Sequence, residues 1–156
     1  MIRMEIPGRE PLEITHLVLD FNGTLARDGH IHNKVKDALC LLGKKVKVHV
    51  LTADTRGNVV QVTRRLPVSI ETLKGENTAS EKVAFIRSLG KEHVIAIGNG
   101  TNDQDMLREA KLGLCVIEGE GAATAAVMAS DAVFSSVLDA LRFILKPLRH
   151  RATLRT

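Results

Sequence analysis

Aromatic side chains are scarce in this 156-residue sequence, which contains no tryptophan, no tyrosine and only four phenylalanines. Proteins that recognise single-stranded RNA commonly stack the bases on aromatic side chains. A surface of that kind is therefore not expected, and nucleic acid is not an expected partner. Because 44% of the residues are hydrophobic, the sequence predicts a packed core made mainly of aliphatic side chains.

Cysteines and long apolar runs are also few. The two cysteines, Cys40 and Cys115, each lie inside an apolar stretch, which predicts buried free thiols in a reducing compartment and argues against a disulfide framework. No run approaches the roughly 20 apolar residues of a membrane span. The N-terminal residues 1–5 lack an apolar signal core. We therefore expect a cytoplasmic protein without a membrane partner.

The charge is unevenly distributed. The formal net charge is +4, and basic residues gather in Lys146–Arg151 and at Arg155. This segment is interpreted either as a solvated tail or as one that contacts phosphate or nucleic acid. The length fits one domain, so we expect a single domain over residues 1–156, with a core of about 12–146 and a basic tail over 147–156.

Short apolar runs alternate with helical patterns along the chain. The expected strands are 14–19, 46–51, 68–73, 94–97, 112–117 and 132–134. The expected helices are 33–42, 56–65, 78–89, 102–110, 121–129 and 136–145. This alternation predicts an α/β fold in three layers, Rossmann-like, with a central parallel sheet and helices on both faces.

Polar clusters follow three of these strands directly. Asp20, Thr52 and the stretch Gly98–Asp103 each come after an apolar run. Parallel sheets bind ligands outside the carboxyl ends of their strands. The three clusters are therefore expected to meet in one crevice.

Each cluster has two interpretations when taken alone. Asp20 in Asp20–Leu25 is either an ionised nucleophile or part of an Asx-type turn. In Leu51–Thr55, the Thr52 hydroxyl and neighbouring N–H groups either hold an anion, or Asp54 or Thr55 simply caps a helix.

The other two clusters are equally open when taken alone. Lys82 lies near the start of a helix, where the macrodipole disfavours a cation. It is either paired with a phosphate or an exposed lysine. Gly98–Leu107 offers oxygen ligands that suit Mg²⁺, or it is a glycine turn whose acidic residues complement a helix N-terminus.

Taken together and in this order, the four clusters resemble the four motifs of the haloacid dehalogenase superfamily, over roughly residues 14–138. The resemblance implies that Asp20 forms an aspartyl-phosphate and that Lys82 neutralises charge. It also implies phosphate-binding roles for Thr52, Ala53, Lys82 and Asn102. The implied cofactor is Mg²⁺, held by Asp20, the backbone carbonyl of Asn22, Asn99 and Asp103. The implied partner is a small phosphorylated substrate.

Two positions depart from the family pattern. Asn22 stands where the second motif I aspartate usually transfers protons, and an amide cannot do so. General acid–base catalysis typically contributes 10²–10⁴-fold, so slow turnover or a persistent aspartyl-phosphate is expected. Asn99 replaces the usual first motif IV aspartate, which predicts weaker metal binding and leaves Asp103 as the main carboxylate.

Within the superfamily, the chain most resembles the phosphorylation domain of P-type ATPases. The similarity lies in Asp20–Thr24, Thr52–Asp54 and Gly98–Asp103, and it continues through 110–134. Only Leu25–Leu51 separates the first two motifs, which leaves no room for a cap domain or a nucleotide-binding domain. The resemblance thus implies a free-standing, capless phosphorylation domain, for which specific adenine recognition is not expected.

Three functions remain open on this evidence. The first is a Mg²⁺-dependent phosphatase or phosphotransferase, in which Asp20, Asn22, Thr52 and Lys82 form the catalytic set. The second is a non-catalytic phosphate- or partner-binding regulatory module, which Asn22 and Asn99 favour. The third is ATP hydrolysis in the P-type manner. Gly119–Thr124 resembles a dinucleotide fingerprint only weakly and is interpreted as a turn plus helix start. An open crevice could also be covered by a neighbouring subunit in a homo-oligomer.

Overall fold

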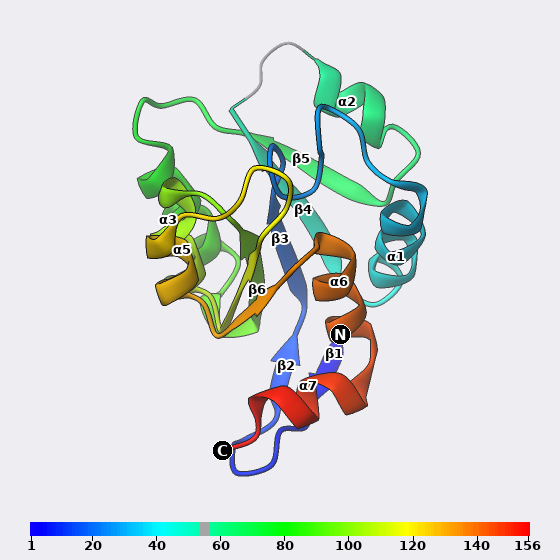
Figure 1. The fold of residues 1–156 in the computed structure, drawn as a ribbon, viewed down its shortest axis with the longest axis vertical. Helices are drawn as coiled ribbons and strands as arrows, with labels where there is room; N and C mark the ends of the chain where they lie inside the picture. The colour runs from blue at the N-terminus through cyan, green and yellow to red at the C-terminus, as the bar shows by residue number, and fades with distance from the viewer. Residues whose placement is uncertain (54–56) are drawn as a thin grey trace.

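The computed structural model describes residues 1–53 and 57–156, shown as a ribbon in Figure 1. The strands are β1 Ile2–Met4, β2 Leu12–Ile14, β3 His16–Asp20, β4 Lys47–Thr52, β5 Val68–Thr72, β6 Val94–Gly98, β7 Leu112–Val116 and β8 Ala132–Phe134. The α-helices are α1 Asn33–Gly43, α2 Asn58–Thr63, α3 Thr78–Ser88, α4 Gln104–Glu109, α5 Thr124–Ala129, α6 Val137–Leu145 and α7 Pro147–Leu154, with short 3₁₀ turns η1 Lys91–His93 and η2 Thr101–Asp103.

Six strands form one parallel sheet in the order β5-β4-β3-β6-β7-β8. The first of these in the chain, β3, is central, and the strand order reverses between β3 and β6. Parallel sheets of this kind bind ligands beside such a reversal, at the carboxyl ends of the strands. Asp20, Thr52 and Gly98 end three adjacent strands at that edge.

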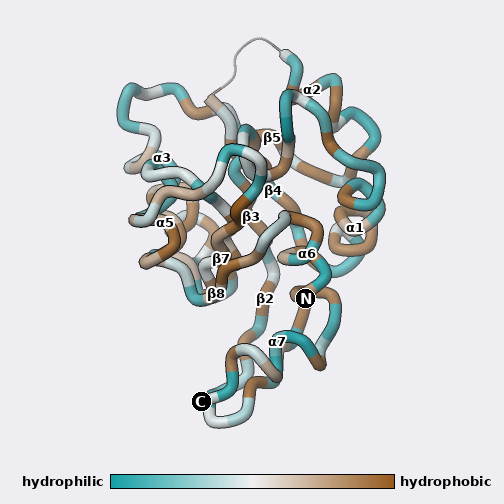
Figure 2. The backbone as a smooth tube through the Cα atoms, viewed as in Figure 1, coloured by the Kyte–Doolittle hydropathy of each residue, from teal (hydrophilic) through white to brown (hydrophobic). Residues whose placement is uncertain are grey.

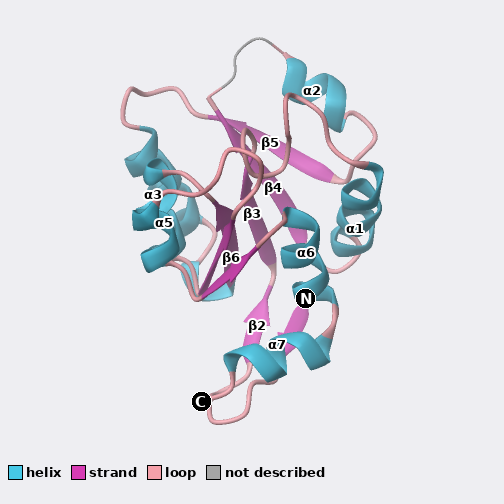
Figure 3. Cartoon of the chain, viewed as in Figure 1, coloured by secondary structure: helices cyan, strands magenta, loops and turns pink. Residues whose placement is uncertain are grey.

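Helices cover both faces of the sheet, as Figure 3 shows, which confirms the predicted three-layer α/β class. Alternate residues of the central strands β3 and β6 belong to different apolar clusters. Leu17 and Leu19 of β3 pack in the cluster that includes α1 and α6, whereas Val18 packs in the one that includes α3, α4 and α5. Burial on both faces explains why the strands read as continuous apolar runs.

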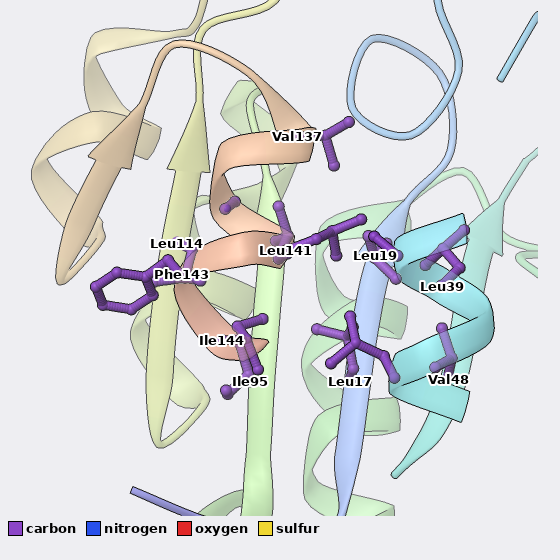
Figure 4. Packing of buried hydrophobic residues seen from close by; sticks show 14 of the residues in the cluster. Leu17, Leu19, Leu39, Val48, Ile95, Leu114, Val137, Leu141, Phe143 and Ile144 are labelled. Carbon is purple, nitrogen blue, oxygen red and sulfur yellow. The ribbon is translucent and has the colours of Figure 1, made fainter. Parts of the chain in front are cut away.

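The larger cluster joins the sheet to helices α1 and α6. In Figure 4, Leu141 and Ile144 of α6 lie over the sheet beside Ile95, and Leu39 of α1 lies beside Leu19. Phe143 packs against Phe134, with ring centroids 4.9 Å apart. The core is thus aliphatic, with few aromatic contacts, as the composition predicts.

Two expectations were wrong. Cys40 is exposed, because it lies on the outer side of α1, whereas Cys115 in β7 is buried as expected. Residues 147–154 form α7 instead of a solvated tail, and His150 and Leu154 are buried. A proline at the first helical position starts a helix without losing a hydrogen bond, and Pro147 occupies such a position.

A small antiparallel pair, β1 and β2, lies beside α7 at the end of the molecule away from the carboxyl ends of the strands (Figure 1). The backbone coloured by hydropathy in Figure 2 shows brown apolar stretches along β1 and β2. The Thr156 N–H donates to the Pro7 carbonyl at 3.4 Å, so the last residue contacts the segment between β1 and β2. The sequence analysis did not predict β1.

The connection between β3 and β4 is short. Residues 21–46 contain a looped segment and α1, and they form no separate cap. Within residues 1–53 and 57–156, no helix has the length and apolar character that crossing a membrane requires.

Candidate active site

The loops at the carboxyl ends of β3, β4 and β6 enclose a cavity of about 460 Å³. The predicted residues that line it are Asp20, Asn22, Thr52, Ala53, Lys82, Asn99 and Asn102. They come from four separate segments of the chain, so the cavity exists only in the folded protein.

Asp20 ends the central strand, and its side chain is 16% exposed. The backbone turns directly after it: Ala26 N–H and Leu25 N–H both donate to the Phe21 carbonyl, at 2.9 and 3.0 Å. Gly23 has φ of +76°, a conformation that favours glycine. This turn leaves the Asp20 carboxylate at the cavity while Asn22 lines its wall.

Lys82 forms ion pairs with two carboxylates. It lies in the second turn of α3, whose first N–H groups are capped by Asn77. Its side chain is 1% exposed, and Nζ lies 2.9 Å from Asp20 Oδ1 and 2.6 Å from Asp103 Oδ1. Two acidic partners therefore explain a lysine at the start of a helix.

Asp103 is fully buried, and both of its carboxylate oxygens have partners. Oδ1 accepts from Lys82, and Oδ2 accepts from the backbone N–H groups of Asn99 and Gly100, each at 2.9 Å. The carboxylate thus closes the glycine turn after β6 and fixes the position of Lys82. To bind a cation directly, Asp103 would have to give up one of these bonds.

The charges of Asp20, Lys82 and Asp103 shift the pKa values of Asp20 and Lys82. Burial and the nearby negative charge of Asp103 raise the pKa of Asp20 to about 7, although Lys82 opposes the shift. Burial lowers the pKa of Lys82, but Asp20 and Asp103 outweigh this effect and raise it above its ordinary value. Lys82 is therefore an ammonium at neutral pH.

Thr52 ends β4 and is 2% exposed, and its carbonyl accepts from the Leu73 N–H at 2.8 Å. Ala53 follows it on the cavity wall. Asn102 is exposed, and its Nδ2 donates to Thr78 Oγ1 at 3.3 Å across the cavity lining. The predicted capping residues Asp54 and Thr55 lie outside the described residues, so that alternative stays a prediction.

Asn99 has a structural reason to be an amide. Its Oδ1 accepts from Thr24 Oγ1 at 3.3 Å, and its Nδ2 donates to the Gly121 carbonyl at 3.1 Å. A carboxylate cannot donate to a carbonyl oxygen, so an aspartate here would lose the second bond. The substitution thus ties the loop after β7 to the turn after β6.

The oxygen atoms at the cavity are suitable ligands for a hard cation. Mg²⁺ prefers carboxylate, amide and carbonyl oxygens, which Asp20, Asn99 and the Asn22 backbone supply. Among the described residues there is no cluster of three acidic, histidine or cysteine side chains arranged around a cation position. The oxygen chemistry fits Mg²⁺, with less negative charge than a set of three carboxylates would bring.

The sequence analysis overlooked one carboxylate in this cavity. Glu120, in the loop between β7 and α5, lines the same wall as Asn22 and Asn99. The signal was the position of Glu120 between two glycines in the loop that follows β7, at the edge where Asp20, Thr52 and Gly98 also lie.

Comparisons with known proteins agree with this arrangement. Residues 74–136, which hold Lys82, Asn99 and Asp103, match the family described as haloacid dehalogenase-like hydrolase. This match covers 63 of the 156 residues, and over that segment the chain is similar to hydrolases of the haloacid dehalogenase superfamily. Its resemblance to P-type ATPases within that superfamily stays a prediction.

The curated relatives that are similar in sequence include one that matches more than half of this chain. It is the uncharacterized protein MJ0073 of Methanocaldococcus jannaschii, 42% identical over 87 residues, which are 51% of this chain and 94% of the relative.

Two solved phosphatase structures share the fold. The first is 3-deoxy-D-manno-octulosonate 8-phosphate phosphatase from Moraxella catarrhalis, in complex with magnesium, phosphate and the sugar acid. It has a TM-score of 0.72 and 18% identity, over 89% of this chain and 90% of that one. The second is the cobalt-bound form of the corresponding phosphatase from Haemophilus influenzae. It has a TM-score of 0.71 and 15% identity, over 92% and 94% of the two chains. At these identities the likeness extends to the fold.

Proposed function

We propose that this protein is a Mg²⁺-dependent phosphatase or phosphotransferase that acts on a small phosphate ester through an aspartyl-phosphate on Asp20. The observation that carries the proposal is Lys82, a buried ammonium within 2.9 Å of Asp20 and 2.6 Å of Asp103 at a polar cavity. A positioned cation beside a carboxylate is what phosphoryl transfer to that carboxylate requires.

Charge repulsion is the obstacle in this reaction, because a phosphate dianion approaches an ionised aspartate. Bound Mg²⁺ would offset that repulsion and polarise the phosphoryl oxygens. Asp20 would then attack phosphorus, while Lys82, the Thr52 hydroxyl and the N–H after it hold the transferring oxygens. Asp103 would keep Lys82 in place through its own bonds to the turn at Asn99 and Gly100.

Turnover is expected to be slow. Asn22 lines the cavity at the position where the family usually has a proton-transferring aspartate, and its amide cannot protonate a leaving group. Weaker metal binding at Asn99 would also lower the turnover rate.

The alternative is a phosphate- or partner-binding module without catalysis. The hydrogen bonds of the Asn99 side chain favour it, because both of its polar atoms are engaged within the protein. In that case phosphate would bind at the cavity, but no phosphoryl group would reach Asp20.

The test is a Mg²⁺-dependent screen of p-nitrophenyl phosphate, acetyl phosphate, ATP and sugar-acid phosphates, including the 8-phosphate hydrolysed by the similar enzymes. We expect Asp20→Asn to reduce turnover to the buffer blank, since the amide is not a nucleophile. Asp37→Asn, an exposed aspartate on α1, is the matched control. EDTA should abolish the activity. A phosphoryl label transferred from an acyl phosphate should survive acid quenching on the wild type and on Asp37→Asn, but not on Asp20→Asn. Activity retained in Asp20→Asn would refute the proposal, and phosphate binding without turnover or label would establish the binding module.

A further inference from the structure

Glu120 is held at the cavity by a loop that is tied to the motif IV turn. The loop runs from Ile117 to Ala123, between β7 and α5. The Ala123 N–H donates to the Asn99 carbonyl at 2.8 Å, and Asn99 Nδ2 donates to the Gly121 carbonyl at 3.1 Å. Two hydrogen bonds from the same residue thus fix the residues that flank Glu120 on its C-terminal side.

The Glu120 carboxylate lies against the motif I loop, next to Gly23. A Cβ atom added to Gly23 would collide with Glu120 Oε2 and would lie 3.0 Å from Asn99 Nδ2. The carboxylate therefore lies beside the backbone of the residue that follows Asn22. It fills space that only a glycine at position 23 leaves open.

Few side chains at this cavity can transfer a proton. Within the described lining, the titratable residues are Asp20, Lys82 and Glu120. Asp20 and Lys82 are paired with each other at 2.9 Å. Glu120 has no ion-pair partner among residues 1–53 and 57–156, and it is exposed to solvent at the cavity.

We infer that Glu120 is the general acid and base of the reaction, in place of the aspartate that is absent at position 22. The inference rests on the proposed function at Asp20. In the first step, Asp20 Oδ bonds to phosphorus, the bond from phosphorus to the ester oxygen breaks, and protonated Glu120 gives its proton to the leaving alkoxide. In the second step, the Glu120 carboxylate takes a proton from water as that water attacks phosphorus. The bond to Asp20 then breaks, and inorganic phosphate leaves.

The experiment compares Glu120→Gln with wild type on two substrates that differ in leaving group. An alkyl phosphate needs a proton on its leaving oxygen, whereas p-nitrophenolate leaves without one. We expect the steady-state rate with the alkyl phosphate to fall about 10²–10⁴-fold, the usual contribution of such a group. With p-nitrophenyl phosphate we expect a burst of nitrophenolate, of about one equivalent per protein, followed by slow turnover, because only the second step then needs Glu120.

Two controls separate proton transfer from other roles. Glu10→Gln, at an exposed residue away from the cavity, should match wild type on both substrates. Adding Asn22→Asp to Glu120→Gln should restore part of the lost rate, since it supplies a new proton donor at the neighbouring position. A loss that saturating Mg²⁺ reverses would overturn the inference, because it would assign Glu120 to cation binding.

Wild-type rates in Glu120→Gln, or an equal loss on both substrates without a burst, would also overturn it. These outcomes are distinct from failure of the proposed function itself, in which Asp20→Asn would retain activity or wild type would show none.

Discussion

At the scale of single residues, the site depends on one ammonium shared by two carboxylates. Lys82 is buried, and its contacts to Asp20 and Asp103 leave the three side chains with one net negative charge. Such an arrangement could not be read from the sequence, because Lys82 is 62 residues from Asp20. The order of the four clusters in the sequence did predict that Asp20, Thr52 and Asn99 lie at one cavity, which they line.

Asn22→Asp tests the departure from the family at that position. The new carboxylate would line the cavity beside Asp20 and could transfer a proton to the leaving group. We expect Mg²⁺-dependent turnover of an alkyl phosphate to rise about tenfold, less than the full 10²–10⁴-fold of general acid–base catalysis, because Glu120 already contributes. Steady-state assays at saturating Mg²⁺ measure the change. An unchanged or lower rate would argue against the assignment of position 22.

At the scale of helices and strands, prediction succeeded where a single continuous segment contains both the apolar pattern and the boundary residues of the element. The strand at 94–98 and the helix at 78–88 have an apolar pattern and a glycine boundary of their own. The pair β1 and β2 has only three residues in each strand, too few to show a period. Its stability comes from pairing across a turn and from packing beside α7.

Within α1, the sequence did not show which apolar residues are buried, as Cys40 and Leu41 illustrate. Both lie in the apolar run 38–42, yet both are exposed, while Leu39 and Leu42 are buried. A run of five apolar residues in a helix must place some of them outward, because residues three or four apart share a face. Which ones face outward depends on the packing partner.

Helix α7 allows a matched test of its own packing. Leu154 is 4% exposed and Leu148 is 80% exposed on the same helix. Leu154→Ala should lower the free energy of unfolding by about 2 kcal/mol, the lower end for a buried leucine, whereas Leu148→Ala should change it by less than about 0.5 kcal/mol. Urea unfolding followed by circular dichroism measures both. Equal, negligible effects would show that residues 147–154 are a solvated tail after all.

At the scale of the whole molecule, buried histidines make stability depend on pH. Burial lowers the pKa of His16, His49 and His150 from the ordinary value. His49 is also close to His16, at 3.0 Å, and to Glu71, at 3.8 Å. His49 Nδ1 and His150 Nε2 are buried without a hydrogen-bond partner in the described part of the chain.

Acid should therefore destabilise the protein through these histidines. Because their folded-state pKa values lie below the unfolded value, the unfolded chain binds more protons as the pH falls below about 6.5. Their contribution is complete above that pH and is lost as the pH falls through the folded-state values. We expect the urea midpoint to be lower at pH 5 than at pH 7.5. The drop should be smaller in His150→Gln and unchanged in His30→Gln, an exposed residue. An identical drop in all three proteins would exclude a role for His150.

The central place of β3 in the sheet has a consequence for biosynthesis. Asp20 is translated before β6, which pairs with β3 and ends at Gly98, and Lys82 emerges from the ribosome more than sixty residues after the aspartate. A nascent chain shorter than this has the reactive carboxylate without its counter-charge. Phosphoryl transfer to Asp20 therefore requires that the chain has been translated beyond Gly98 and that strands from distant parts of the chain have paired, which is a slow kind of assembly.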